Sequence, residues 1–330
     1  MILLTLLVKK SQYKEELTQF NSFKNLIFNI FEMRFLIFYD MNTFFSENYT
    51  DYNDVELVQL SIDGDKKALQ NLIIRHQLFI YNLALKMVGN VQDAEDLTQE
   101  VFIKIITSLS KFKGESKFTT WAYRITVNHF INNKKKNSKL RTVSFDSYFN
   151  SIDAVPSQDL NDQEEKELKD TIEEIRINCT TGMLLCLSKE QRMIYILGEM
   201  FEIGHNLGGE ILGITPGNFR IKLMRTREEL YNWMNKKCGL VNVNNPCRCS
   251  KKTRGYISEG KVDPNNLKFN TRYKSKISEL SKNKAVPFTN TVDELNKKVF
   301  HNHPAQTPIQ ASKIVNDILN NDLIKSILDL

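Results

Sequence analysis

The stretch that decides the fold runs from Asp93 to Asn133 and reads DAEDLTQEVFIKIITSLSKFKGESKFTTWAYRITVNHFINN. Its first half predicts an amphipathic helix, because apolar residues recur at helical spacing. These residues are Ala94, Leu97, Val101 and Ile105. The three carboxylates Asp93, Asp96 and Glu100 share a second face of that helix, which we name the acidic ridge. Such a ridge suits a positively charged protein surface.

A second helix is expected after the break at residues 113–116, Lys-Gly-Glu-Ser. It carries aromatic and polar side chains and runs into the basic triplet 134–136. Exposed aromatic rings can stack on unpaired bases while cations hold phosphates, so this helix suits nucleic acid. A plainer interpretation stays open at this point. Trp and Tyr at helical spacing are commonly core residues, and a lysine triplet can be a solvated helix end.

The order of these parts resembles region 2 of bacterial RNA polymerase sigma factors of the extracytoplasmic-function type. The segments that carry the resemblance are DAEDLTQEVFIKI and FTTWAYRITVNHFIN. The resemblance implies that the first helix docks on core polymerase through Asp93, Asp96, Leu97, Gln99, Glu100 and Phe102. It implies that the second helix melts and holds the minus-ten promoter element with Trp121, Tyr123, Arg124, Asn128, His129, Asn132, Lys134, Lys135 and Lys136. We assign the cations to phosphates, and Asn128 and the aromatic residues to bases.

Residues 183–237 predict a second helical domain. Ser188 with Gln191 forms a capping-box pattern, Gly213 ends a short helix, and Thr215-Pro216 begins a basic one. The inward stripe of the basic helix is Phe219, Leu223, Thr226 and Leu230. This is the pattern of a helix-turn-helix, whose second helix enters a major groove. A basic helix within an ordinary bundle is the alternative.

This domain resembles region 4 of the same sigma factors, through LSKEQRMIYILGEM and EILGITPGNFRIKLMRTREEL. The resemblance implies that the minus-thirty-five element is read by Thr215, Asn218, Arg220, Ile221, Lys222 and Arg225. Two features depart from the family. Residues 208–209 are both Gly, which predicts a short or loose supporting helix, since each Gly costs about 1 kcal/mol against Ala. Ile221 and Met224 lie where polar residues are commoner, so the promoter sequence of relatives cannot be transferred.

With 330 residues and a net charge of +6, the chain has room for two or three small domains and is compatible with nucleic acid. We expect an all-α fold of two small helical domains joined by an acidic linker and followed by a partly helical tail. The expected divisions are an upstream extension at 1–40 that the working protein lacks, region 2 at 41–140, the linker at 141–182, region 4 at 183–237 and a cysteine-containing extension at 238–330. The first half of the linker is expected to be mobile.

Three cysteines in the extension, Cys238, Cys247 and Cys249, leave several interpretations open. They can be reduced structural residues, metal ligands that need a distant fourth partner, or redox sensors. No Cys-x-x-Cys pair occurs in the chain, so a reducing cytosol is the simplest compartment. His301 and His303 precede a Pro and are expected to be exposed to solvent. The final segment, 309–330, is amphipathic and is expected to dock on the two domains or on a regulator.

These observations predict a sigma factor, a cytoplasmic protein whose partners are core RNA polymerase and promoter DNA. An anti-sigma factor or other regulator is left open as a further partner. The alternative is a stand-alone helix-turn-helix regulator, which needs neither the acidic ridge nor a strand-melting surface. We expect no catalytic activity, no cofactor, no metal and no membrane span, because no phosphate loop, paired metal motif, nucleophile–base signature or long apolar segment occurs.

Overall fold

The computed structural model describes residues 52–132, 142–268, 300, 303–308 and 310–328, and these form an all-helical structure. The upstream extension, the lysines 134–136 and His301 lie outside the described residues. None of the described helices is long and apolar enough to cross a bilayer.

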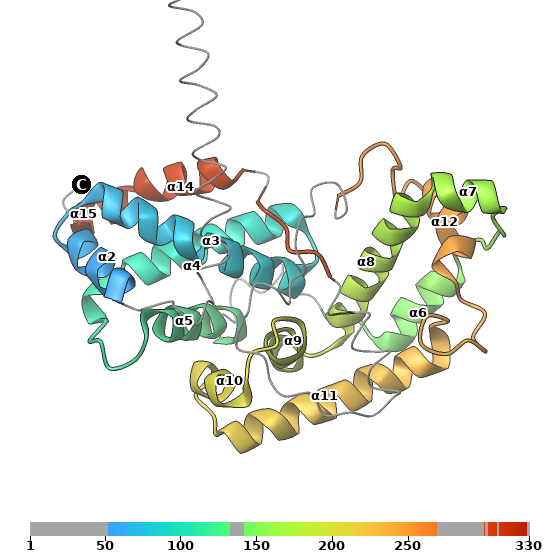
Figure 1. The fold of residues 1–330 in the computed structure, drawn as a ribbon, viewed down its shortest axis with the longest axis horizontal. Helices are drawn as coiled ribbons and strands as arrows, with labels where there is room; N and C mark the ends of the chain where they lie inside the picture. Colours follow the sequence, from blue (N-terminus) through green and yellow to red (C-terminus); the bar gives the residue numbers. More distant parts are fainter. Residues whose placement is uncertain (1–51, 133–141, 269–299, 301–302, 309, 329–330) are drawn as a thin grey trace, which may run out of the picture.

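The first lobe is a bundle of four helices, at the left of Figure 1. They are α2 (Tyr52–Ile62), α3 (Lys66–Val88), α4 (Val91–Ile106) and α5 (Phe118–Asn132), with a 3-10 turn η1 (Leu109–Lys111) between α4 and α5. Local sequence fixes the ends of α3: the Asp65 side chain accepts hydrogen bonds from the first-turn N–H groups, and Gly89 closes the helix at φ 68°. The core of the lobe lies between α3, α4 and α5 and includes Phe79, Val101 and Phe118.

The helix-turn-helix follows the linker. It comprises α9 (Lys189–Tyr195), a π-helical turn η2 (Ile196–Met200), α10 (His205–Leu212) and α11 (Pro216–Lys237). The predicted caps are confirmed: Ser188 and Gln191 form a capping box, and the Thr215 hydroxyl accepts from the backbone N–H of Asn218 at 3.2 Å. In Figure 1, α9 lies between α5, α10 and α11, and α11 runs along the lower edge of the molecule.

The paired glycines of α10 correct one expectation. A Cβ on Gly208 would lie 2.6 Å from the Phe219 ring, and a Cβ on Gly209 would lie 2.8 Å from the Ile214 carbonyl oxygen. Both positions therefore need Gly because α10 packs directly against the start of α11. The glycines permit close packing, and α10 is short, with 8 residues, as one of the two expectations has it, and it is regular rather than loose.

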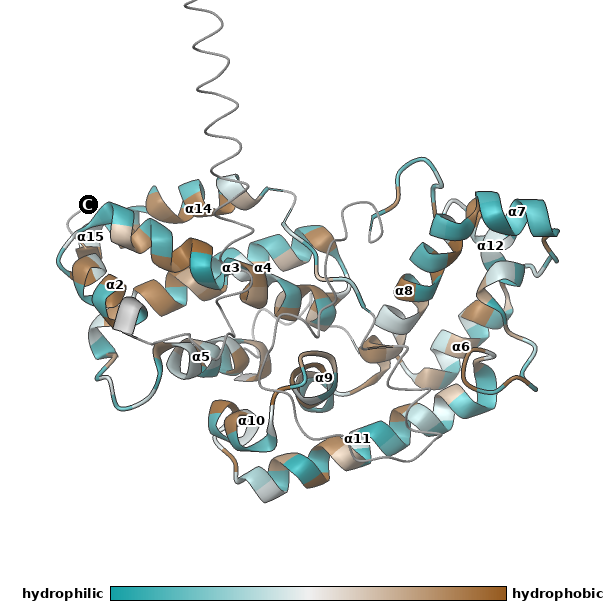
Figure 2. Ribbon diagram, viewed as in Figure 1, coloured by the Kyte–Doolittle hydropathy of each residue, from teal (hydrophilic) through white to brown (hydrophobic). Residues whose placement is uncertain are grey.

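The linker is largely helical, including the first half that was expected to be mobile. It contains α6 (Phe145–Asp153), α7 (Asp162–Glu167) and α8 (Lys169–Cys186). Trp233 of α11 stacks on Phe145 and Phe149, with ring centroids 5.2 and 6.0 Å away, so α6 is held against the helix-turn-helix. Only α7 has no buried residue, and it is hydrophilic along its whole length in Figure 2.

One buried cation joins the two domains. Arg192 of α9 is fully buried and donates hydrogen bonds to four backbone carbonyls, those of Leu184, Leu185, Leu187 and Met87. The first three end α8, and the fourth ends α3 of the first lobe. Burial lowers the pKa of this guanidinium to about 10. The group remains charged at neutral pH, and its charge-assisted hydrogen bonds go to carbonyls at the ends of two helices.

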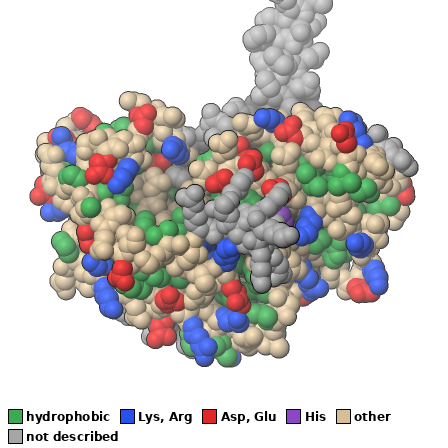
Figure 3. Space-filling view, turned by 180° about the vertical axis from the view of Figure 1, so that it is seen from behind, with side chains coloured by type: hydrophobic (Ala, Val, Ile, Leu, Met, Phe, Trp, Pro, Cys, Tyr) green, Lys and Arg blue, Asp and Glu red, His purple; other side chains and the backbone are tan. Residues whose placement is uncertain are grey.

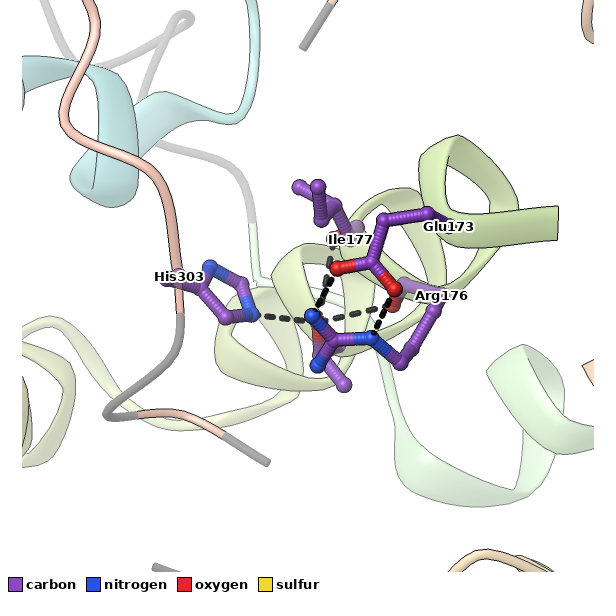
Figure 4. A network of polar contacts seen from close by, with 5 residues as sticks. Glu173, Arg176, Ile177 and His303 are labelled. Atoms are coloured by element: carbon purple, nitrogen blue, oxygen red, sulfur yellow. Dashed lines mark hydrogen bonds and ion pairs between the residues drawn. The ribbon is translucent and has the colours of Figure 1, made fainter. Parts of the chain in front are cut away.

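The end of the chain crosses from α8 to the first lobe. His303 is buried, which corrects its expected exposure, and its Nε2 lies 2.5 Å from the Thr180 Oγ1 of α8 (Figure 4). The backbone of Gln306 then exchanges two hydrogen bonds with the Asn82 side chain of α3. Helices α14 (Ala311–Leu319) and α15 (Asp322–Leu328) follow, and α14 packs on α3 and α4. The expected single amphipathic helix is split because the Asn321 side chain caps α15.

Candidate polymerase and promoter interface

The acidic ridge lies on α4 as the spacing predicts. Residues 93, 96 and 100 project from one side of this continuous helix, and Asp96 is exposed while Asp93 and Glu100 are half-buried. The Asn90 cap at the start of α4 fixes the helix register by accepting a hydrogen bond from the Asp93 N–H at 3.0 Å. The ridge is therefore a preformed row of carboxylates on a rigid element.

Three other residues of the predicted polymerase site differ in exposure. Leu97 and Phe102 are 6% and 2% exposed and belong to the core of the bundle, which corrects their assignment as surface contacts. Phe102 lines a small apolar cavity between α3, α4 and α5. Gln99 is half-buried. Leu97 and Phe102 pack α4 against the core of the bundle, and the acidic ridge forms the polar surface of the helix.

The residues of α5 that were predicted to contact DNA lie on two different faces of the helix. Trp121, Arg124 and Asn128 follow one another at spacings of three and four, so they share one face of the helix. Arg124 and Asn128 are exposed, and Trp121 is half-buried against Phe112 and Phe118. These three side chains form a surface that we name the α5 face. Asn132 ends the helix, and its side chain lies outside the described residues.

Tyr123 and His129 are core residues, which corrects their assignment to DNA. Tyr123 is 1% exposed and stacks on Phe79 of α3, with ring centroids 3.9 Å apart. His129 is 6% exposed, and its Nε2 lies 3.5 Å from the Glu100 Oε2 of α4. Each ring faces a neighbouring helix of the bundle and cannot reach a base while the bundle is intact. The plainer interpretation of helical aromatic residues is right for these two.

The α5 face lies against the helix-turn-helix domain. The Arg124 guanidinium donates hydrogen bonds from Nε and Nη2 to the Glu210 carbonyl oxygen, at 3.2 and 3.0 Å. Glu210 belongs to α10, which packs along α5, as Figure 1 shows. Part of the α5 face is therefore covered in this arrangement of the two domains.

Helix α11 presents most of its predicted reading residues to solvent. Thr215, Asn218, Arg220, Ile221 and Arg225 are exposed. Lys222 is half-buried, and its Nζ forms an ion pair with Glu190 of α9 at 2.6 Å. Among the residues that the structure describes, no carboxylate lies within ion-pair distance of Arg220 or Arg225. Met224 is 55% exposed and was not in the predicted set, although its position outside the inward apolar stripe was a usable signal.

On the face that Figure 3 shows, charged side chains of both signs are mixed rather than gathered by sign. The overall charge of +6 is therefore a weak guide to the nucleic-acid surface. Small groups of like charges, such as Arg220 with Arg225, are a better guide to a nucleic-acid surface. Salt screens interactions between exposed charges beyond about 10 Å, so only nearby charges act together.

The cysteines of the extension lie beside the linker. The backbones of Cys238 and Cys247 pair in an isolated parallel β-bridge. Cys249 begins α12 (Cys249–Ser258), which packs on α8. All five cysteines of the chain are free thiols. Burial raises the pKa of Cys249 to about 12 and also raises the pKa of Cys238 and of Cys247, which keeps these thiols protonated. Within the described ranges, no three His, Cys, Asp or Glu side chains are arranged to hold a metal ion.

Comparison with known proteins agrees with this geometry. Residues 72–140 match the family described as sigma-70 region 2. The chain is 28% identical over 185 residues to the RNA polymerase sigma-H factor of Pseudomonas aeruginosa, covering 55% of this chain and 93% of the relative. It is 27% identical over 173 residues to the ECF RNA polymerase sigma factor SigW of Bacillus subtilis, covering 51% of this chain and 89% of the relative.

A third relative, the ECF RNA polymerase sigma-E factor of Escherichia coli, is 29% identical over 196 residues, which is 57% of this chain and 95% of the relative. These alignments are longer than the region 2 match, so the likeness continues beyond region 2. They also leave a large part of this chain without a counterpart. The chain thus carries a sigma-70 region 2 and, with its helix-turn-helix, is similar to RNA polymerase sigma factors of the extracytoplasmic-function type over nearly their whole length.

Proposed function

We propose that three surfaces of this sigma factor divide the work of initiation. The acidic ridge of α4 binds core RNA polymerase, the α5 face with the lysines 134–136 holds the melted minus-ten element, and α11 reads the minus-thirty-five element. The working units are a region 2 domain at 41–140 and a region 4 domain at 183–237. The protein performs no covalent chemistry and acts in the cytoplasm with core polymerase.

The observation that carries this proposal is the separation of residues on α5. The indole of Trp121, the guanidinium of Arg124 and the amide of Asn128 share one face, while Tyr123 packs on the opposite side of the helix. A stacking ring, a cation and an amide together can hold an extruded base beside its phosphate. A stand-alone repressor, the second candidate, has no use for such a face.

The described arrangement is proposed to be the resting state. Arg124 cannot donate to a phosphate while its Nε and Nη2 are bonded to the Glu210 carbonyl. The α5 face therefore becomes available when α10 moves away. Core polymerase, by binding the ridge on α4, would favour the open form if the two domains occupy separate places on its surface.

The test uses full-length protein, core polymerase and a promoter pool, with run-off transcripts as the readout. Asp96→Arg reverses charge on the exposed ridge, and we expect its affinity for core polymerase to fall about tenfold, or about 1.4 kcal/mol. The matched control is Glu165→Arg, a charge reversal on exposed α7. Arg220→Ala should weaken binding to promoter DNA and leave polymerase affinity unchanged.

Two results would contradict the proposal. Normal polymerase binding by Asp96→Arg would remove the ridge as the docking surface. Duplex DNA binding without any run-off transcript would favour the stand-alone regulator, since a sigma factor must act through core polymerase.

A further inference from the structure

Helix α11 has an apolar strip at the centre of its solvent face. Ile221 is 45% exposed and Met224 is 55% exposed, while the inward stripe, including Phe219 at 0%, lies on the opposite side. With 100° per residue, positions 217, 221 and 224 lie within about 50° of the helix's outward direction. These two side chains are among the few exposed large hydrophobic residues of the described structure.

Arginines border this strip on both sides. Arg220 and Arg225 lie on opposite flanks of it, and both are exposed. Glu228 is exposed and continues the strip one turn later, where it would repel phosphates. The surface that suits DNA is therefore confined to the first three turns of α11. The N-terminal part of a recognition helix is also the part that meets base edges in a helix-turn-helix.

Two kinds of partner could cover an exposed apolar strip, and the border decides between them. A protein partner that binds through apolar contact would remove water from the two arginines, and the described part of this chain supplies no acidic side chain to pair with them. Burying these unpaired charges would cost free energy. A DNA duplex supplies phosphates for both arginines. It also supplies an apolar group in the major groove, the C5-methyl group of thymine, which is the only base substituent there that apolar side chains favour.

We propose that Ile221 and Met224 make this sigma factor select thymine in its duplex promoter element by contact with thymine C5-methyl groups. Arg220 and Arg225 anchor α11 on the flanking phosphates. Neither Ile nor Met can donate or accept a conventional hydrogen bond, so discrimination at these positions rests on the methyl group. The inference depends on the proposed role of α11 as the reading helix.

The experiment exchanges thymine for deoxyuridine, which removes only the methyl group. A duplex pool with a randomised window is selected with full-length protein bound to core polymerase, and the best-bound duplex is remade with deoxyuridine at each thymine in turn. We expect one or two positions at which affinity falls about fourfold, the factor expected for one methyl group. At those positions, Ile221→Ala or Met224→Ala should weaken binding to the thymine duplex and remove the difference between thymine and deoxyuridine.

The matched control is Val243→Ala, which shortens an exposed apolar side chain, 79% accessible, beyond the end of α11. This variant should lose as much affinity as the wild-type protein when thymine is replaced by deoxyuridine. Arg220→Ala should weaken all the duplexes by a similar factor, and Lys313→Ala, an exposed lysine on α14, is its control. Circular dichroism should show unchanged helix content, because each replaced side chain is exposed.

The outcomes separate the inference from the function on which it rests. If Arg220→Ala binds every duplex normally, α11 is not the reading helix and both proposals fail. If Arg220→Ala weakens binding but no deoxyuridine substitution does, α11 reads DNA and the thymine inference is wrong. A deoxyuridine effect that persists unchanged in both alanine variants would also overturn it. An alanine variant that binds DNA normally but loses a protein regulator would assign the strip to that protein.

Discussion

Replacing Lys86 with methionine should stabilise the protein. Lys86 lies on α3 with 0% exposure, and its Nζ has no hydrogen-bond partner in the described structure. Burial lowers the pKa of its ammonium group from 10.5 to about 7. Methionine has a similar length, carries no charge and adapts to irregular packing. The change therefore removes a desolvation cost with little change in volume.

The size of the effect follows from the change in pKa. At about 1.4 kcal/mol per pKa unit, a fall from 10.5 to about 7 corresponds to about 5 kcal/mol for the charged amine. At pH 7 about half of the folded molecules carry the neutral amine, so the cost is about 4 kcal/mol. Imperfect packing of the new side chain reduces the gain, and we expect about 2–4 kcal/mol in the free energy of unfolding.

The effect should depend on pH in a defined direction. Unfolded Lys86 keeps its proton up to about pH 10.5, whereas the folded form releases it near pH 7. Between these values unfolding takes up a proton, so the wild-type protein gains stability as pH rises. The advantage of Lys86→Met is therefore largest at or below pH 7 and disappears toward pH 10.5.

Urea unfolding followed by circular dichroism at pH 6, 7.5 and 9 measures both the gain and its slope. The control is Lys67→Met, which replaces an exposed lysine on the same helix. It should show no gain in stability and no dependence of its stability difference on pH. A Lys86→Met variant that is no more stable than wild type at pH 6, or whose advantage does not change with pH, would refute the reasoning.

Three further changes test contacts between the parts of the chain. Arg192→Met removes a buried charged donor that bonds four backbone carbonyls and should lower the free energy of unfolding by about 3–5 kcal/mol, measured in urea; a loss below 1 kcal/mol would contradict this. Burial lowers the pKa of His303 well below 6.5, so the stability that its neutral form provides is complete above pH 6.5 and falls as pH drops toward the folded pKa. Hydrogen exchange of residues 303–328 should therefore speed up between pH 7.5 and 5.5 after correction for intrinsic rates, and His303→Gln should flatten that dependence. Gly208→Ala should destabilise the protein by about 1–3 kcal/mol despite its higher helix propensity, because the added Cβ meets the Phe219 ring; a stabilised variant would show that this ring can move.

Local signals predicted the helix ends because the groups that satisfy a terminus lie within a few residues of it. Ser188 and Thr215 cap the expected helices, and Gly213 closes one of them in the left-handed conformation. Periodicity likewise placed the acidic ridge on one side of α4. These features are properties of a single helix and need no tertiary information.

The orientation of α5 could not be predicted in the same way. Aromatic residues occur on both of its sides, so the sequence does not show which side faces the core. Phe79, a residue 44 positions before Tyr123, decides it by stacking on that ring. The course of the tail depends on even more distant contacts, since His303 meets Thr180 across 123 residues. The role of Gly208 could not be predicted for the same reason, because it depends on the packing of α10 against Phe219.

The bond from Arg124 to the Glu210 carbonyl makes domain contact and strand capture competing uses of one guanidinium. A backbone carbonyl cannot be removed by changing the side chain of residue 210, so control over this bond lies with Arg124. A phosphate is a stronger acceptor for a guanidinium than a neutral carbonyl, because it carries a negative charge. In the proposed mechanism, promoter DNA exchanges directly for α10, so that strand melting and the separation of the two domains are two sides of a single equilibrium.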